Sequence, residues 1–199
     1  MRTIGLIGAI GAGKSVVRAA LSDLGAAVID ADRVGHAIYE PGTPGFGAVV
    51  GAFGTGIVDA AGRIDRPTLG ALVFSDAAKL ARLNAIVHPL IRAESERQLD
   101  EIRLEGRAPA AIVEAAILIE AGWNTLVDEI WLVVARRQHV LERLASSRGL
   151  STAQVDARLA RQSTDAERRR FADVVIENDG SLDDLRQRVR ALWQERIPR

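Results

Sequence analysis

The chain lacks cysteine entirely and has one methionine, one tyrosine and three tryptophans among its 199 residues. Without cysteine it can form no disulfide, no thiolate nucleophile and no cysteine zinc site. Basic and acidic residues balance at 26 each, so no excess of positive charge indicates a nucleic-acid-binding protein. Stability must therefore come from a hydrophobic core, for which a hydrophobic content of 48% in a chain of this length is sufficient.

No segment of the sequence is a convincing targeting signal or membrane span. The uncharged run 41–58 has the length of a membrane span, but Pro41, Pro44 and several glycines would break a spanning helix. We therefore expect a cytoplasmic protein with no membrane partner and no nucleic-acid partner. No obligate protein partner is evident either.

Short apolar runs alternate with stretches of helical spacing along the whole chain. The runs predict strands at 3–8, 26–30, within 110–119, at 129–135 and at 174–177. Helical patterns fill most of the intervals, and we expect the helical stretch from 76 to 105 to break before Pro89. The alternation predicts an α/β fold, a three-layer structure in which helices cover both faces of a parallel sheet.

The first predicted strand leads into the segment Gly8-Ala9-Ile10-Gly11-Ala12-Gly13-Lys14-Ser15, which matches the phosphate-binding pattern G-x-x-x-x-G-K-[ST]. Glycines let the backbone amides approach a phosphate closely, and the following helix adds its N-terminus to this anion site. Lys14 would bridge the β- and γ-phosphates of ATP, and Ser15 would ligate Mg²⁺. The residues expected to hold the nucleotide here are Gly8, Gly11, Ala12, Gly13, Lys14, Ser15 and Val16.

Two other nucleotide-binding classes share part of this pattern. A dinucleotide-binding loop needs a third glycine where this chain has Val16, and that class leaves Lys14 and Ser15 unexplained. A GTPase would use the segment 59–62 as a switch element, but the lysine of its guanine-binding motif is missing, since Lys79 lies in an unrelated context. We read 59–62 as an ordinary turn.

Two carboxylates follow the second predicted strand, at Asp30 and Asp32. Ligands of parallel sheets bind at the carboxyl ends of the strands, so one of these acids could accept the proton of an attacking hydroxyl. Asp30 is equally compatible with capping a helix and with contacting magnesium or water. Asp32 is the better candidate for the catalytic base.

Further short motifs, in order and spacing, resemble the dephospho-CoA kinase family over nearly the whole chain. They are Gly5–Ser15, Val28–Asp32, Gly62–Arg66, His88–Ile91, Leu118–Glu120, Arg158 with Gln162, and Ala172-Asp173 with Asn178-Asp179-Gly180. The chain departs from the family at Ala116, where proline is usual, and at Val16, where threonine is common. The resemblance implies ATP-dependent phosphorylation of dephospho-CoA to coenzyme A, the last step of coenzyme A biosynthesis.

The resemblance also implies a division of labour along the chain. It predicts one P-loop kinase domain over 1–199, with a core formed by 1–30, 110–135 and 173–199. The acceptor-substrate region would be 31–105 and the lid 136–172. Asp32 would be the base, and Asn178 and Gly180 would lie by the adenine. Lys14 and an arginine of the lid would complete the catalytic set, because arginines stabilise the charge on a transferring phosphoryl group. One or two of Arg143, Arg148, Arg158 and Arg161 would serve, with Arg143 the first choice. Substrate-binding residues would be Asp32, Arg66, His88, Glu120 and Arg158.

Several of these residues have ordinary structural explanations. A single histidine before a proline in a helical stretch, as at His88, is more often structural. Arg66 could form an ion pair at a helix end, and Glu120 could be a surface acid. Without the resemblance the residues predict only ATP phosphoryl transfer to a small hydroxyl substrate. Another small-molecule kinase of shikimate or nucleoside monophosphate type, a nucleotide-binding regulatory protein and an NAD-binding enzyme then remain alternatives.

Overall fold

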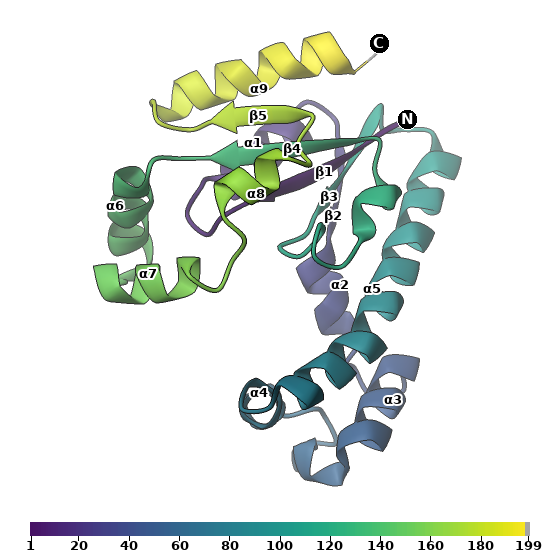
Figure 1. The fold of residues 1–199 in the computed structure, drawn as a ribbon. Coiled ribbons are helices and arrows are strands. Elements are labelled where there is room, and N and C mark those ends of the chain that lie inside the picture. The colour runs from purple at the N-terminus through teal and green to yellow at the C-terminus, as the bar shows by residue number, and fades with distance from the viewer. Residues whose placement is uncertain (198–199) are drawn as a thin grey trace. The chain divides into compact units, whose positions relative to one another are not determined.

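The computed structural model describes residues 1–197, which divide into two compact units. One unit consists of 1–29 and 99–197 and the other of 30–98. Figure 1 shows the elements of both along the chain. The single domain over 1–199 and its sub-regions stay predictions, and their last two residues lie outside the described residues.

A parallel sheet forms the centre of the first unit. Its strands, in the order β2-β3-β1-β4-β5, are β2 (Ala27–Asp30), β3 (Ala110–Glu114), β1 (Arg2–Gly8), β4 (Glu129–Val134) and β5 (Val174–Glu177). β1 pairs in parallel with both neighbours, so that Ile4 lies opposite Ile112 on one side and Glu129 on the other. The strands β1 and β4 are buried along almost their whole length because helices or loops cover both faces of the sheet.

One face of the sheet packs against α1 (Lys14–Asp23) and α9 (Leu182–Arg196). Leu6 and Trp131 on the strands are fully buried there with Val17 and Val189 on the helices. On the other face, Leu118 and Val127, from the segment between β3 and β4, pack where a side chain at Gly5 would stand. The predicted three-layer α/β fold is therefore confirmed.

Further helices of this unit follow β4. They are α6 (Arg137–Arg148), α7 (Thr152–Leu159) and α8 (Asp165–Arg169). A short 3₁₀ helix (Trp123–Leu126), which the sequence patterns did not predict, lies between β3 and β4.

The second unit is largely helical. It contains α2 (Ala31–Ala37), α3 (Pro44–Phe53), a 3₁₀ helix (Thr55–Ile57), α4 (Arg66–Phe74) and most of α5 (Ala77–Glu105). Asp30 and Asp65 cap α2 and α4 through hydrogen bonds from backbone amides three residues on. The predicted turn at 59–62 is confirmed, because the Gly62 amide donates to the carbonyl oxygen of Asp59 and the Asp59 carboxylate accepts a hydrogen bond from the Ala61 amide.

The expected break of the helix before Pro89 is wrong. α5 runs without interruption from Ala77 to Glu105 with Pro89 inside it. Proline removes one backbone hydrogen bond and strains the preceding turn, which costs about 3 kcal/mol in an isolated helix. The neighbouring side chains Val87 and Ile91 are buried, so tertiary packing holds both halves of the helix and outweighs this local cost.

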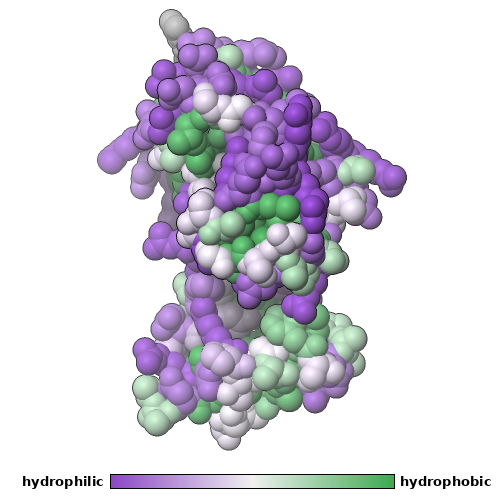
Figure 2. Space-filling model, turned by 90° about the vertical axis from the view of Figure 1, so that its left-hand side faces the viewer, coloured by the Kyte–Doolittle hydropathy of each residue, from purple (hydrophilic) through white to green (hydrophobic). Residues whose placement is uncertain are grey.

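One face of the molecule exposes both hydrophilic and hydrophobic side chains. The face drawn in Figure 2 carries hydrophilic and hydrophobic residues in alternating patches. Among residues 1–197, no helix combines the length and the apolar character needed to cross a membrane.

Candidate active site

The segment between β1 and α1 has the backbone of a phosphate-binding loop. Gly8 ends the strand, and α1 begins at Lys14 immediately after Gly13, whose φ of 107° only glycine adopts readily. Gly13 is the N-cap residue of α1 and makes no side-chain hydrogen bond to the first amides of the helix. The first amides of a helix carry partial positive charge, so this end of α1 suits an anion.

The side chain of Lys14 folds back over the loop. Its ammonium donates to the carbonyl oxygens of Gly8 at 2.8 Å and Ala9 at 3.3 Å. The ammonium therefore lies above the loop, where it could meet the terminal phosphates of a nucleotide. Ser15 follows in the first turn of α1, with its side chain exposed. The donor set of backbone amides, one ammonium and one hydroxyl fits a triphosphate with its magnesium ion.

Asn178, directly after β5, supports the loop from the side. It is 5% exposed, and its amide nitrogen donates to the carbonyl oxygen of Ala12 at 2.7 Å. A side chain at Gly13 would collide with this amide group. Asn178 thus contacts the loop at Ala12 and at Gly13. The structure therefore brings Asn178 and the loop, which the sequence predicted to share the nucleotide site, next to each other.

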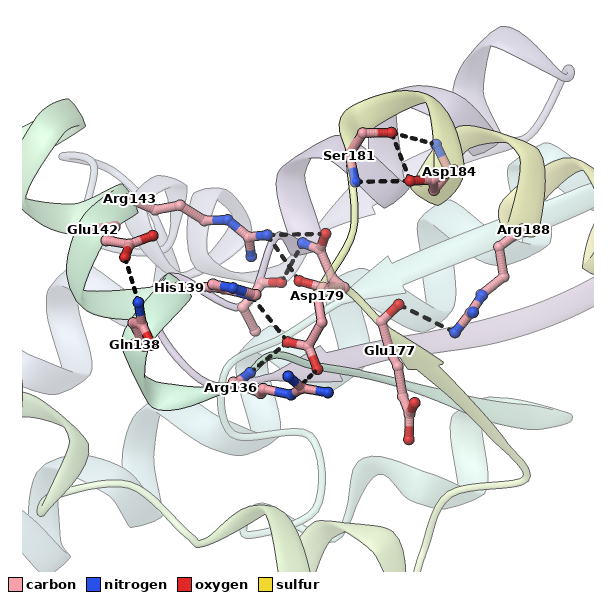
Figure 3. Close-up of polar contacts among 12 residues, drawn as sticks. Arg136, Gln138, His139, Glu142, Arg143, Glu177, Asp179, Ser181, Asp184 and Arg188 are labelled. Atoms are coloured by element: carbon pink, nitrogen blue, oxygen red, sulfur yellow. Dashed lines mark hydrogen bonds and ion pairs between the residues drawn. The ribbon is translucent and has the colours of Figure 1, made fainter.

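Arg143 of α6 reaches the same asparagine. Its Nη2 donates to the backbone oxygen of Asn178 at 2.8 Å and to the side-chain oxygen at 3.1 Å. Figure 3 shows the guanidinium pointing from α6 toward the turn after β5. Its Nη1 is buried and makes no hydrogen bond within the described residues. A buried guanidinium nitrogen without an acceptor is costly, so this atom is suited to an anionic ligand.

The segment after β4 also contacts the loop, through Gln162 in the bend after α7 and through apolar side chains. The side-chain oxygen of Gln162 accepts a hydrogen bond from the Ile10 amide at 3.0 Å. Ile10 packs against a small core formed by Val140, Leu144 and Val155. The predicted lid segment is therefore anchored on the tip of the phosphate-binding loop.

A cavity of about 590 Å³ lies beside the turn after β5. Its lining includes Asn178 and Gly180, the two residues expected near adenine. Pockets of this size commonly hold ligands.

Glu120 and Arg158 lie in the same unit but at its surface. The carboxylate of Glu120 accepts a hydrogen bond from the Ser163 hydroxyl, so it ties the segment after β3 to the turn after α7. Arg158 is exposed on α7. The structure therefore shows Glu120 in a structural contact and leaves its role toward substrate a prediction.

The residues predicted for the acceptor substrate lie mainly in the second unit. Asp32 is exposed in the first turn of α2, and Asp30 before it is the helix cap. The sequence left two roles open for Asp30, capping a helix or contacting magnesium or water, and the structure favours the cap. His88 is partly buried within α5, and this burial lowers its pKa, which favours the neutral imidazole.

Arg66 lies at the edge of a cavity of about 480 Å³ in the second unit. Its guanidinium is 5.6 Å from the centre of the Tyr39 ring and donates to the carbonyl oxygen of His36 at 3.3 Å. Burial raises the pKa of Tyr39, although the charge of Arg66 opposes the shift. Sequence reasoning missed Tyr39, and the signal available was a lone tyrosine shortly before the turn at Pro41.

A parallel sheet with a phosphate-binding loop after its first strand, and an arginine-bearing helical segment beside that loop, define a kinase of the P-loop class. The family model described as dephospho-CoA kinase matches residues 2–184. The chain belongs to the dephospho-CoA kinase family. This membership favours the kinase interpretation over the regulatory and NAD-binding alternatives.

Relatives cover the full length of the chain. A dephospho-CoA kinase of Symbiobacterium thermophilum is 46% identical over 194 residues, which is 98% of this chain and 81% of the relative. One of Geobacter sulfurreducens is 42% identical over 198 residues and 100% of both chains. A solved structure of dephospho-CoA kinase from Campylobacter jejuni is 27% identical and superposes with a TM-score of 0.74 over 98% of this chain and 97% of that one.

Proposed function

We propose that this kinase transfers the γ-phosphate of Mg²⁺-ATP to the ribose 3′-hydroxyl of dephospho-CoA and forms ADP and coenzyme A. The observation that carries the proposal is the loop after β1, where Lys14 and the start of α1 form a site for a polyphosphate. Family membership supplies the acceptor, since the relatives are named for it.

The nucleotide is held by the loop and by the residues around Asn178. Backbone amides of 8–16 bind the phosphates, and Lys14 exchanges its carbonyl contacts for β- and γ-phosphate oxygens. Ser15 would hold Mg²⁺ through its hydroxyl, and the ion would supply positive charge that neutralises the phosphates. Adenine lies against Asn178 and Gly180.

The acceptor hydroxyl attacks phosphorus in line with the bond to the leaving ADP oxygen. A new oxygen–phosphorus bond forms as the β–γ bridge breaks, and the bridging electron pair leaves with ADP. Asp32 accepts the hydroxyl proton or orients the hydroxyl. The free Nη1 of Arg143 and the ammonium of Lys14 stabilise the charge on the transferring oxygens.

Four residues are proposed to bind the acceptor substrate besides Asp32. They are Arg66, His88, Glu120 and Arg158. Arg66 is best supported, because a guanidinium at the rim of a cavity can bind a substrate phosphate with two parallel hydrogen bonds. We further propose that 31–105 is the acceptor region, in agreement with the compact unit 30–98, and that 136–172 closes over the nucleotide as a lid in the cytoplasmic enzyme.

The deciding experiment is ADP release with and without dephospho-CoA, measured in parallel with shikimate and nucleoside monophosphates as acceptors. Release that depends on dephospho-CoA, and coenzyme A recovered in equal amount, supports the proposal. Release that depends on another acceptor contradicts the substrate. Nucleotide binding without any acceptor-dependent ADP contradicts the reaction and favours a regulatory protein.

A further inference from the structure

The N-terminus of α6 is built differently from those of the helices that follow it. α7, α8 and α9 each begin with a complete capping box, in which the first residue and the residue three positions later bind one another's backbone amides. α6 has Arg136 at the capping position and His139 three residues later, and its own capping residue provides no side-chain cap. The amide of Arg136 therefore needs an acceptor from elsewhere.

Asp179 supplies that acceptor from a position 43 residues further along the chain. One carboxylate oxygen accepts from the Arg136 amide at 2.7 Å and lies 3.3 Å from Nδ1 of His139. The other oxygen is 3.1 Å from Nε of Arg136. Figure 3 shows the carboxylate between these groups, with the turn after β5 on one side and the first turn of α6 on the other. Asp179 thus takes the place that glutamate or glutamine holds in a capping box.

The residue before Asp179 holds the same helix at a second point. Asn178 accepts two hydrogen bonds from Arg143, seven residues after Arg136. Seven residues are about two helical turns, so positions 136 and 143 lie on one face of α6. Asp179 therefore binds the beginning of α6, and Asn178 binds Arg143 two turns further along. These two attachments together fix the rotation of α6 about its axis.

The amide of Asn178 continues this connection to the phosphate-binding loop through its hydrogen bond to Ala12. Nη2 of Arg143 binds this same asparagine, and Nη1 of the same guanidinium is buried without a partner within the described residues. An error of 1 Å in a group that stabilises a transition state can cost about a hundredfold in rate. The attachment of α6 therefore matters for the reaction as well as for the fold.

We propose that Asp179 is a positioning residue of the phosphoryl-transfer site, because it binds the N-terminus of α6 and so holds Arg143 against the loop that carries the nucleotide. The inference rests on the proposed function through the role of Arg143. Asp179 acts through that arginine and takes no part in the chemistry itself. The hydrogen bond from the Arg136 amide also holds the pKa of the Asp179 carboxyl below its usual value, so the cap is charged at neutral pH.

The test is a double-mutant cycle of Asp179→Ala with Arg143→Ala in the full chain, with kcat and both KM values measured. We expect Asp179→Ala to lower kcat about tenfold in the wild-type background and to leave the KM for dephospho-CoA within about twofold. In the Arg143→Ala background the same change should alter kcat by less than about twofold, because the group that Asp179 positions is gone.

Two further variants separate positioning from stability. Asp179→Asn keeps an acceptor for the Arg136 amide and should retain activity within about threefold of wild type. Ser151→Ala removes the hydroxyl that accepts from the Gln154 amide in the capping box of α7, so it weakens another helix of the lid without touching Asn178 or Asp179. It should leave kcat within about twofold. In the nucleotide-free protein, trypsin should cleave after Arg136 and Arg137 faster in Asp179→Ala than in Ser151→Ala.

The outcomes keep this inference apart from the proposed function. A strong loss in Arg143→Ala together with wild-type kcat in Asp179→Ala overturns the inference and leaves the function intact. Wild-type kcat in Arg143→Ala removes the arginine from the proposed mechanism. Equal losses in Asp179→Ala and Ser151→Ala, or additive losses in the cycle, reduce Asp179 to a stabilising cap. Should Asp179→Ala not fold, the cycle is run with Asp179→Asn, whose smaller loss must likewise vanish in the Arg143→Ala background.

Discussion

The residues proposed to hold the nucleotide differ from those proposed to hold the acceptor in their hydrogen bonding and in their exposure to solvent. Around the phosphate-binding loop, Lys14, Arg143 and Asn178 are fixed by hydrogen bonds to backbone oxygens, and Asn178 is buried. In the unit 30–98, Asp32 and Arg66 are exposed on the first turns of their helices. The residues proposed for the nucleotide thus hold one another through the loop and the turn after β5, whereas Asp32 and Arg66, proposed for the acceptor, are exposed, and Arg66 has one hydrogen bond to the carbonyl oxygen of His36.

The largest effect should follow from Lys14→Ala on the nucleotide side. Loss of the ammonium removes the charge that faces the β- and γ-phosphates, so kcat/KM should fall about a thousandfold. The matched control is Lys79→Ala, since this second lysine pairs with Asp76 at the surface of α5. Steady-state kinetics should show the Lys79 variant at wild-type activity, and a similar loss in both variants would contradict a specific role for Lys14.

Asp32→Asn tests the acceptor side next. If Asp32 is the base, kcat should fall about a hundredfold or more while the KM for ATP stays unchanged. Asp30→Asn is the control, because asparagine caps a helix as well as aspartate does and α2 should keep its start. Turnover at the wild-type level in Asp32→Asn would remove this residue from the base role.

Arg66→Ala should give a smaller and more selective effect. We expect the KM for dephospho-CoA to rise about tenfold, the cost of a lost hydrogen bond to a charged group, with no change in the KM for ATP. Arg82→Ala is the control, since Arg82 lies over Phe53 at 5.9 Å much as Arg66 lies over Tyr39. Equal changes in the KM for dephospho-CoA and the KM for ATP would show that Arg66 supports the fold of the unit and does not bind the acceptor.

The smallest expected effect concerns stability at low pH. The hydrogen bond from Arg97 lowers the pKa of Glu94 from 4.5 to about 2. A carboxyl whose pKa is lower in the folded state stabilises the fold above its unfolded pKa, and this contribution disappears as the pH falls toward 2. Glu94→Gln should therefore reduce the unfolding free energy by at most about 1 kcal/mol at pH 7, since the pair is solvent-screened.

Chemical denaturation of both proteins between pH 7 and pH 2 would measure this difference. The difference in unfolding free energy between wild type and Glu94→Gln should become smaller below pH 4.5. A gap that is constant over the whole range would exclude the ionised pair as its cause. Glu96→Gln removes another acid of α5 and controls for the change in net charge.

The same contrast explains how much the sequence could predict. The loop from Gly8 to Ser15 was predicted in detail because its chemistry requires particular residues at fixed spacing next to each other. The cap of α6 by Asp179 could not be predicted, because the two partners are 43 residues apart and one of them is a backbone amide. The available signal was indirect, namely that Arg136, the residue before α6, has a side chain that cannot cap a helix.

The continuity of α5 shows a different limit. Local rules place a helix boundary before Pro89, and they do so for a sound reason. Only the burial of Val87 and Ile91, which depends on residues distant in sequence, decides that the helix continues. The positions of Arg66 and Tyr39 relative to one another depend in the same way on how α2 and α4 fold together.

The side-by-side contact of Ala12 and Gly13 with Asn178 has a consequence for how the enzyme is assembled. The motif near the N-terminus is complete as a sequence within 15 residues, yet its geometry depends on a strand that is synthesised near the end of the chain. A fragment that stopped before β5 would carry the full motif without its supporting amide. Full affinity for ATP should therefore require β5 in the sheet, so nucleotide affinity would report whether this C-terminal strand has paired.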